Sequence, residues 1–183
     1  MRNFLFILVA LSASAAPESR KYINSNYAVA VKALQLAEKG DAVSQFEYAL
    51  MCERGEGIPQ NHGDAVKWFR HSAAQGHAPA QLFLGMMYAS GKGVGKNMTE
   101  AIKWVTLAAE QDDTTAQFYL GGVYFSSTAV PQDYVQAYKW FTLAGRSDPS
   151  RAATLDAVAQ KMTPGQLAEA QRQVKVWTPR KAK

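Results

Sequence analysis

His77 to Asp112 reads HAPAQLFLGMMYASGKGVGKNMTEAIKWVTLAAEQD, and it is the middle one of three similar windows. Shifting the chain by 36 residues brings residues 41–76, 77–112 and 113–148 into register. The positions that recur are Gln45, Gln81 and Gln117, then Ala49, Gly85 and Gly121, then Lys67, Lys103 and Lys139, and then Trp68, Trp104 and Trp140. A fixed period of this length indicates a stacked-repeat architecture.

The first half of each window is predicted to form a helix. In the central window, Ala80, Leu84 and Met87 are four and three residues apart, which places them on one helical face. Gly91 and Gly93 follow, and glycine readily adopts the left-handed conformation that ends helices. The helix is therefore expected to end just before these two glycines.

The second half of each window is predicted to form another helix. Apolar residues again recur three and four apart between 101 and 109, and Asn97 or Thr99 is suited to cap the start. Such a helix pair must stack on its neighbours, because it cannot bury its apolar face alone.

A small residue in the first helix and a tryptophan in the second are predicted to pack together. Gly85 allows the two backbones to approach, and Trp104 is expected to fill the space beside it. Trp104→Ala is therefore expected to lower the free energy of unfolding by about 3–5 kcal/mol. Trp68 and Trp140 have the same structural role in this interpretation.

The 36-residue period within residues 41–148, and the apolar spacing on either side of it, predict the positions of the helices. These are 26–39, 42–53, 62–75, 78–89, 98–111, 114–126, 134–146, 149–162 and 164–177.

The repeated pattern A-Q-x-x-L-G-x-x-Y-x-x-G-x-G-V, followed by A-x-x-W-x-x-x-A-A, resembles the Sel-1-like repeat (SLR) family, which is related to the tetratricopeptide repeats. The matching residues of the central window are Ala80, Gln81, Leu84, Gly85, Tyr88, Gly91, Gly93, Val94, Ala101, Trp104, Ala108 and Ala109. Cys52 replaces the tyrosine in the first window, and Ser127 and Ala129 replace the loop glycines in the third. The resemblance implies an all-α, right-handed α/α solenoid that serves as an adaptor or scaffold.

The first 15 residues are predicted to be a secretory signal peptide. Arg2 precedes the apolar run Phe4–Leu11, which is too short to span a bilayer, and Ala13–Ala15 provides an A-x-A cleavage site. Cleavage after Ala15 predicts a mature chain that begins at Ala16, in the periplasm or secreted, without stable membrane insertion. An uncleaved anchor is the alternative.

Both ends of the repeat array are predicted to carry helical caps. Residues 16–25 are polar and predicted as a flexible leader, and 26–40 as an N-terminal capping helix. Residues 149–178 predict a C-terminal capping pair, whose second helix opens with capping-box spacing at 163–166. The basic tail 179–183 is expected to be frayed.

The reactive side chains do not form a recognisable catalytic or metal site. Cys52 has no cysteine partner and is interpreted as a buried packing residue. His62, His71 and His77 lack zinc-ligand spacing, so no metal is expected. The glycine-rich stretch 91–96 follows a helix and not a strand, which argues against a phosphate-binding loop and a cofactor. We therefore expect a non-enzymatic protein.

The net charge of +5 comes from basic residues scattered among acidic ones. Nucleic-acid binding requires a clustered basic face, so no nucleic-acid partner is expected. We expect a monomer.

The most informative surface for function is the face of the first helices turned away from their packed side. By analogy with tetratricopeptide-type solenoids, whose first helices line the concave face, Leu50, Leu82, Met86 and Phe125 are predicted to contact a protein or peptide partner. Phe46 and Phe118 share this stripe but are predicted to be packed. The alternative is that the whole stripe belongs to the core.

The predicted function is an exported, non-enzymatic protein–protein interaction scaffold. One alternative is a structural component of an envelope or polysaccharide-export assembly. Another is a cell-wall or β-lactam hydrolase, which rests only on a resemblance to cysteine-rich relatives.

Overall fold

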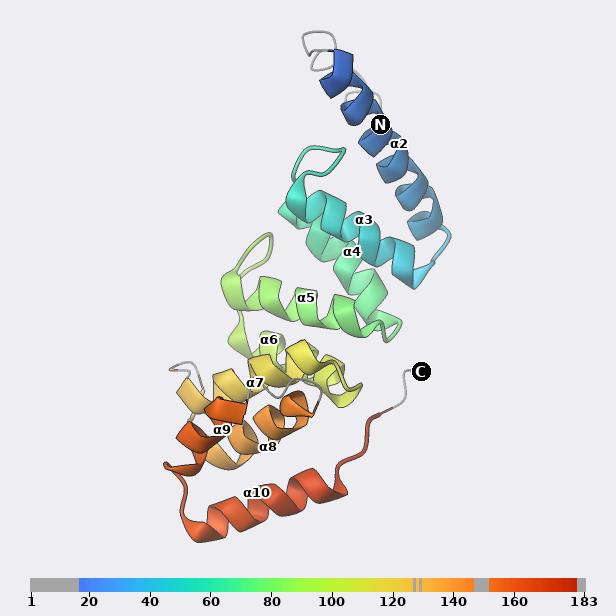
Figure 1. The fold of residues 1–183 in the computed structure, drawn as a ribbon. Coiled ribbons are helices and arrows are strands. Elements are labelled where there is room, and N and C mark those ends of the chain that lie inside the picture. The colour runs from blue at the N-terminus through green and yellow to red at the C-terminus, as the bar shows by residue number, and fades with distance from the viewer. Residues whose placement is uncertain (1–16, 127, 129, 147–151, 181–183) are drawn as a thin grey trace. The chain divides into compact units, whose positions relative to one another are not determined.

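The computed structural model describes residues 17–126, 128, 130–146 and 152–180, and its regular secondary structure there is helical (Figure 1). The helices are α2 (Pro17–Glu38), α3 (Ala42–Arg54), α4 (His62–Ala74), α5 (Ala78–Ser90), α6 (Met98–Glu110), α7 (Thr114–Ser126), α8 (Tyr134–Gly145), α9 (Ala152–Ala159) and α10 (Pro164–Val176). From α3 to α8, and again at α10, each helix begins at the predicted residue and ends within one residue of the prediction. The all-α repeat fold is confirmed.

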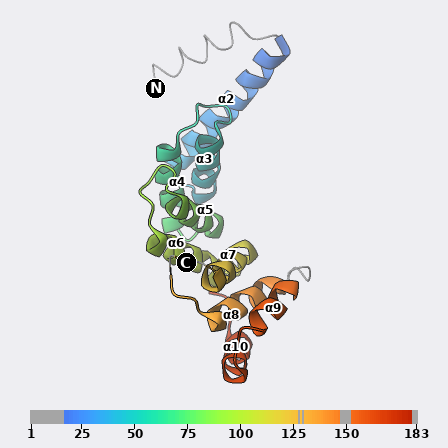
Figure 2. The same ribbon diagram turned by 90° about the vertical axis from the view of Figure 1, so that its left-hand side faces the viewer.

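The N-terminal helix differs from the prediction. Because α2 begins at Pro17, residues 17–25 have a helical backbone, and the prediction of a flexible leader there is wrong. The N-terminal part of α2 extends past the ends of α3 and α4 (Figure 2). The predicted signal peptide, and with it Ala16, lies outside the described residues.

The C-terminal cap is shorter than predicted, since α9 ends at Ala159. Its predicted start at residue 149 lies outside the described residues, as do Ser127 and Ala129 of the third loop.

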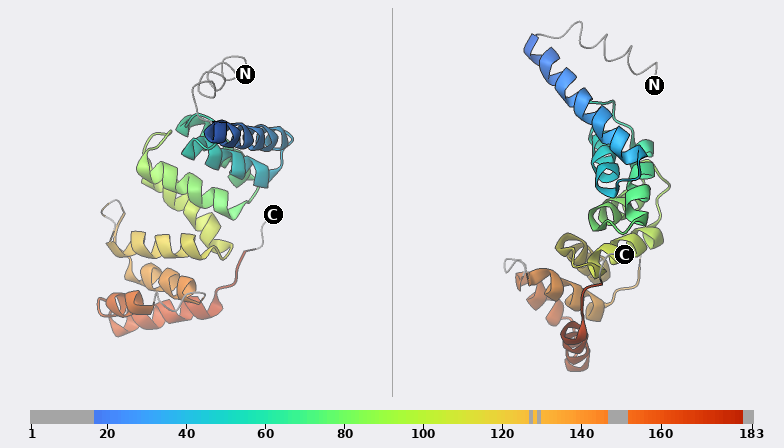
Figure 3. Two further views of the ribbon diagram at one scale, coloured as in Figure 1. Left: turned by 45° about the horizontal axis from the view of Figure 1, so that its top comes forward. Right: turned by 90° about the vertical axis from the view of Figure 1, so that its right-hand side faces the viewer.

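The chain divides into two compact units between Ser72 and Ala73. In the first unit α2 packs on α3, and the ring pairs Phe46–Phe69 and Tyr48–Trp68 join α3 to α4. In the second unit α5, α6, α7 and α8 pack in chain order, and both α9 and α10 pack against α8 (Figure 3). The buried core of each unit lies between such consecutive helices.

Side-chain caps start the second helix of each repeat, again at 36-residue intervals. The side-chain oxygens of Asn61, Asn97 and Asp133 accept hydrogen bonds from backbone N–H groups three residues later, at 3.1, 3.1 and 3.0 Å. These bonds satisfy N–H groups that the first turn of a helix leaves unpaired. Asn97, and not Thr99, is therefore the cap of α6.

The recurring glutamines have a role that the sequence analysis did not find. In Gln45, Gln81 and Gln117 the Nε2 atom donates to the backbone carbonyl eight residues earlier, at 3.1 Å in each case. Those carbonyls lie near the ends of the preceding helices, where intrahelical partners are lacking. Each glutamine thus binds a carbonyl just before the first helix of its own repeat begins.

The glycines in the first helices pack against a different partner from the one predicted. A Cβ added at Gly85 would lie 2.5 Å from Val105 Cγ2 and 2.9 Å from the Ala101 carbonyl oxygen, and one at Gly121 would lie 2.6 Å from Phe141 Cδ1. The residue after the tryptophan therefore fills this space. Because the helix rotates by about 100° per residue, the neighbouring tryptophan faces elsewhere.

The three tryptophans also differ in burial. Trp140 is 4% exposed and belongs to the core of the second unit, whereas Trp68 and Trp104 are only half-buried. The prediction that all three are equivalent core residues is wrong for Trp68 and Trp104. The loop glycines behave as predicted, because Gly91 caps α5 with φ of 79° and Gly93 has φ of 69°.

The final helix packs back onto the repeats. Thr163 and Gln166 form the predicted capping box at the start of α10, and Val174 and Trp177 pack against the core of the second unit. Arg180 is not frayed, since its backbone N–H donates to the Glu110 carbonyl oxygen at 2.6 Å. The rest of the basic tail, 181–183, lies outside the described residues.

Candidate partner-binding face on α5 and α7

The candidate site is the exposed side of the first helices in the second unit. Met86 on α5 and Gly122 on α7 are 36 residues apart and occupy equivalent positions. The Met86 side chain is 44% exposed, so a partner could reach it. Methionine is a flexible and polarisable side chain that adapts to apolar partners.

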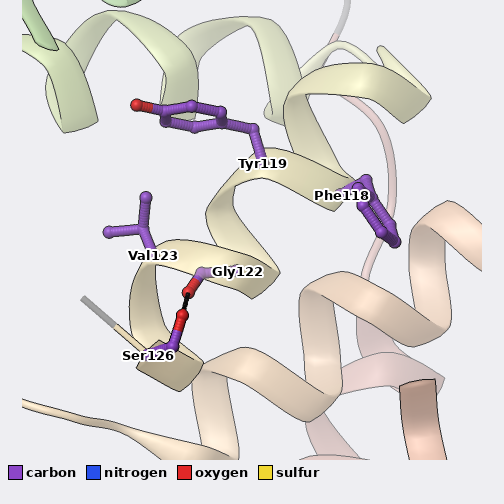
Figure 4. Close-up of a pocket in the computed structure, with 5 residues that line it drawn as sticks. All are labelled: Phe118, Tyr119, Gly122, Val123 and Ser126. Carbon is purple, nitrogen blue, oxygen red and sulfur yellow. Dashed lines mark hydrogen bonds between the residues drawn. The ribbon is translucent and has the colours of Figure 1, made fainter. Parts of the chain in front are cut away.

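A shallow depression of about 380 Å³ lies over Gly122 on α7. Its lining residues are Phe118, Tyr119, Gly122, Val123 and Ser126 (Figure 4). Tyr119 and Val123 form one row along the helix, and Phe118, Gly122 and Ser126 form the other, because residues four apart share a helical face. The depression exists because Gly122 has no side chain where α5 has Met86.

The space above Gly122 is open. A Cβ built at this position would meet no atom within 4 Å, in contrast to the crowded position at Gly121. The Gly122 carbonyl oxygen accepts a hydrogen bond from the Ser126 hydroxyl at 3.2 Å. The Ser126 hydroxyl and the Gly122 carbonyl, two polar groups of the lining, are therefore paired with each other.

Three of the predicted contact residues are less accessible than expected. Leu82 is 5% exposed and lies in the core with Val105 and Leu120, so the prediction that it belongs to the exposed stripe is wrong. Phe125 is half-buried, and its ring lies 6.0 Å from that of Tyr134. Leu50 is also half-buried, and it belongs to the first unit.

Phe118 is more exposed than expected. Its ring packs on Phe141 with centroids 5.2 Å apart, yet the residue remains 38% exposed. The sequence does contain a signal for this exposure, because the side chain one turn later is missing at Gly122. Met86 and Phe118 are thus the exposed large apolar residues of the first helices in this unit.

Burial raises the pKa of two titratable groups, one on this face and one in the first unit. Burial raises the pKa of the Tyr119 hydroxyl, so this group stays neutral at physiological pH. In the first unit, burial raises the pKa of Cys52 to about 11, and the residue is 2% exposed, as expected for a packing role. A thiol in this state is a poor nucleophile, because the thiolate is the reactive form.

Within the part of the chain that the structure describes, His, Cys, Asp and Glu side chains nowhere gather in a group of three that could hold a metal ion. Over the same residues, none of the helices is both long enough and apolar enough to cross a bilayer.

Solved structures resemble this chain. A Sel1 repeat protein from Oxalobacter formigenes is 33% identical with a TM-score of 0.62, over 69% of this chain and 96% of that one. A protective antigen present in uropathogenic Escherichia coli strains, which displays an SLR fold, is 28% identical with a TM-score of 0.60. That match covers 79% of this chain but 39% of the antigen, so the chain spans well under half of the antigen's length. A search of curated proteins found no significant match.

The repeats themselves match a protein-family model. The model described as the Sel1 repeat matches residues 42–77, 78–113 and 114–149, which together make up more than half of the chain. These matches coincide with the helix pairs α3–α4, α5–α6 and α7–α8. The chain belongs to the Sel1 repeat family.

Proposed function

We propose that this protein is a non-enzymatic scaffold that binds an apolar segment of a partner protein on the face formed by α5 and α7. Sel1 repeat proteins are typically protein–protein interaction scaffolds and generally non-catalytic. The observation that carries the proposal is the exposure of Met86 on α5 and of Phe118 on α7, where Phe118 also lines the open depression at Gly122.

The shape of this face suits a helix or an extended segment with large apolar side chains. A contiguous apolar surface on a folded protein commonly marks an interaction site. The depression is shallow and formed by a single helix, which favours one or two anchoring side chains over an enclosed small molecule. Phe118 and Met86 would contact the anchors, and Gly122 would leave room for one of them.

Met86→Glu is expected to weaken binding of the partner at least tenfold, or about 1.4 kcal/mol, because it places a charge in an apolar contact. The stability of the protein is expected to change by less than about 0.5 kcal/mol, since the side chain is exposed. The partner would first be identified by proximity labelling, and its Kd would then be measured by calorimetry alongside urea unfolding.

Two further variants sharpen this test. Val176→Glu makes the same kind of change at an exposed apolar residue of α10, away from the proposed face, and should leave the Kd unchanged. Gly122→Phe should fill the depression and weaken binding without disturbing the fold, because the space there is open. A folded Met86→Glu variant with undiminished affinity would show that the partner binds elsewhere.

We also propose that the protein is exported to the periplasm or the exterior, on the basis of the signal-peptide pattern in residues 1–15. Mass spectrometry of the mature protein is expected to find Ala16 as the first residue. Ala15→Arg should block cleavage, because the site requires a small side chain, and should leave Met1 in place. An intact Met1 in wild-type protein purified from the cell envelope would support an uncleaved anchor instead.

A further inference from the structure

The first unit contains a second candidate site, a cleft of about 480 Å³ between α2 and the α3–α4 pair. One stripe of α2 forms one wall, with lining residues three or four apart from Tyr27 to Glu38. Tyr48 of α3, Ile58 of the following loop and Asp64 in the first turn of α4 form the opposite wall. The volume lies within the range of about 300–1,000 Å³ that is usual for ligand sites.

Close packing fixes the two walls of this cleft. Gly57 has φ of 74°, and a Cβ added there would lie 2.4 Å from the backbone oxygen of Asn26. The loop before Ile58 therefore lies directly against the α2 backbone. On the α3 side, the Tyr48 ring packs edge-on against Trp68 at 5.7 Å. Backbone packing of this loop on α2 and ring packing of Tyr48 on Trp68 thus hold the two walls.

The cleft combines an apolar floor with an acidic rim. Ala30 is buried, and Val31, Leu34 and Ile58 are half-buried, whereas Glu38 and Asp64 are exposed at the rim. Among the described residues, neither of these carboxylates forms an ion pair with a basic side chain. Asp64 Oδ2 accepts a hydrogen bond from the neutral Asn61 amide at 2.6 Å.

Tyr48 lines the cleft together with both carboxylates. Its pKa is raised above the ordinary value first by burial, then by Cys52, and further by the negative charges of Asp64 and Glu38. Glu38 and Asp64 line one cleft, Glu38 from α2 and Asp64 from α4. A cleft lined by apolar side chains and two carboxylates matches an alkyl chain that ends in a cation, as in lysine and arginine.

We propose that this cleft binds a basic segment of a partner protein, with a lysine or arginine stem on Val31 and Leu34 and its cation at Glu38 and Asp64. The site lies in the first unit and is separate from the α5–α7 face. Its test therefore succeeds or fails independently of the function proposed above.

The experiment measures fluorescence anisotropy of a short labelled peptide of alternating arginine and leucine, titrated with the purified full chain. A peptide with glutamate in place of arginine is the matched probe. The basic peptide is expected to bind with a Kd below about 1 mM at low salt. Its affinity should fall as salt screens the exposed charges, whereas the glutamate peptide should not bind.

Variants of the cleft then test the position of the site. Glu38→Gln and Asp64→Asn are each expected to raise the Kd about two- to fivefold, the usual effect of one exposed charge pair. Gln35→Arg should block the cleft, because it places a cation one turn from Glu38 on the same wall. Glu47→Gln removes an exposed charge of α3 that does not line the cleft and should leave the Kd unchanged.

Circular dichroism melts of each variant confirm that it is folded. If Asp64→Asn unfolds, the position of the site is tested with Glu38→Gln and Gln35→Arg alone. Three results would overturn the proposal: a wild-type chain that does not bind the basic peptide, equal binding of the glutamate peptide, or cleft variants that bind like Glu47→Gln. If sedimentation shows that the cleft variants alter self-association and not peptide binding, the occupant is a second copy and the proposal is wrong.

Discussion

Trp140→Ala is expected to lower the free energy of unfolding by about 3–5 kcal/mol, the usual loss when a buried tryptophan is truncated. Trp140 is 4% exposed and packs in the core of the second unit with Leu120 and Leu143. The Lys139 ammonium also lies 4.4 Å from the Trp140 ring centroid, and this cation–π contact is lost with the ring. Urea unfolding followed by circular dichroism measures the change.

The matched control is Trp104→Ala, the same substitution at the equivalent position one repeat earlier. Trp104 is half-buried, so its truncation leaves a smaller cavity and is expected to lower stability less than Trp140→Ala. Sequence alone predicted the full loss of about 3–5 kcal/mol at Trp104, and the structure now places the larger loss at Trp140. If Trp104→Ala proved the more damaging change, the difference in burial between the two rings would not govern their energetics.

The starts and ends of the helices could be predicted from the 36-residue repeat, because residues close in sequence determine where each helix begins and ends. Capping side chains at Asn97 and Asp133, and a glycine with positive φ at Gly91, act within a few residues of the chain. A sequence pattern reports such short-range effects directly. The helix starts from α3 to α8 could therefore be predicted to the residue.

Packing partners could not be predicted in the same way. The helical period alone leaves several residues of the second helix as possible neighbours of Gly85, because Trp104 and Val105 follow Ala101 by three and four residues. The rotation of α6 about its axis decides between them, and it brings Val105 against the glycine. That rotation depends on contacts between helices, which the spacing within one helix does not encode.

The candidate binding face shows the same limit. Leu82 and Phe118 occupy equivalent repeat positions, yet Leu82 is buried and Phe118 is exposed. Two residues at equivalent positions of two repeats point in the same direction from their helices. Their burial can still differ, because it depends on which neighbouring residues pack against each of them. Met86 could be identified as exposed from the sequence, whereas the depression became evident only when Gly122 was seen to have open space above it.

Gly121→Ala is expected to lower the free energy of unfolding by about 1–3 kcal/mol, the usual effect of overpacking a core. Its new Cβ would lie 2.6–2.7 Å from three atoms of the Phe141 ring. Phe141 is itself buried in the second unit, so the ring cannot move into solvent without losing its own contacts. The gain in helix propensity of alanine over glycine, up to about 1 kcal/mol, is too small to offset the larger clashes.

Gly122→Ala, one residue further along the same helix, is the control and is expected to have the opposite sign. Its Cβ meets no atom within 4 Å, so the higher helix propensity of alanine should raise stability by about 0.5–1 kcal/mol. Urea unfolding measures the free energy of unfolding of both variants. The comparison distinguishes the packed side of α7 from its open side, because each variant adds one methyl group to one of these sides. If Gly122→Ala were as destabilising as Gly121→Ala, the space over Gly122 would be occupied, and the face proposed for the partner would be part of the core.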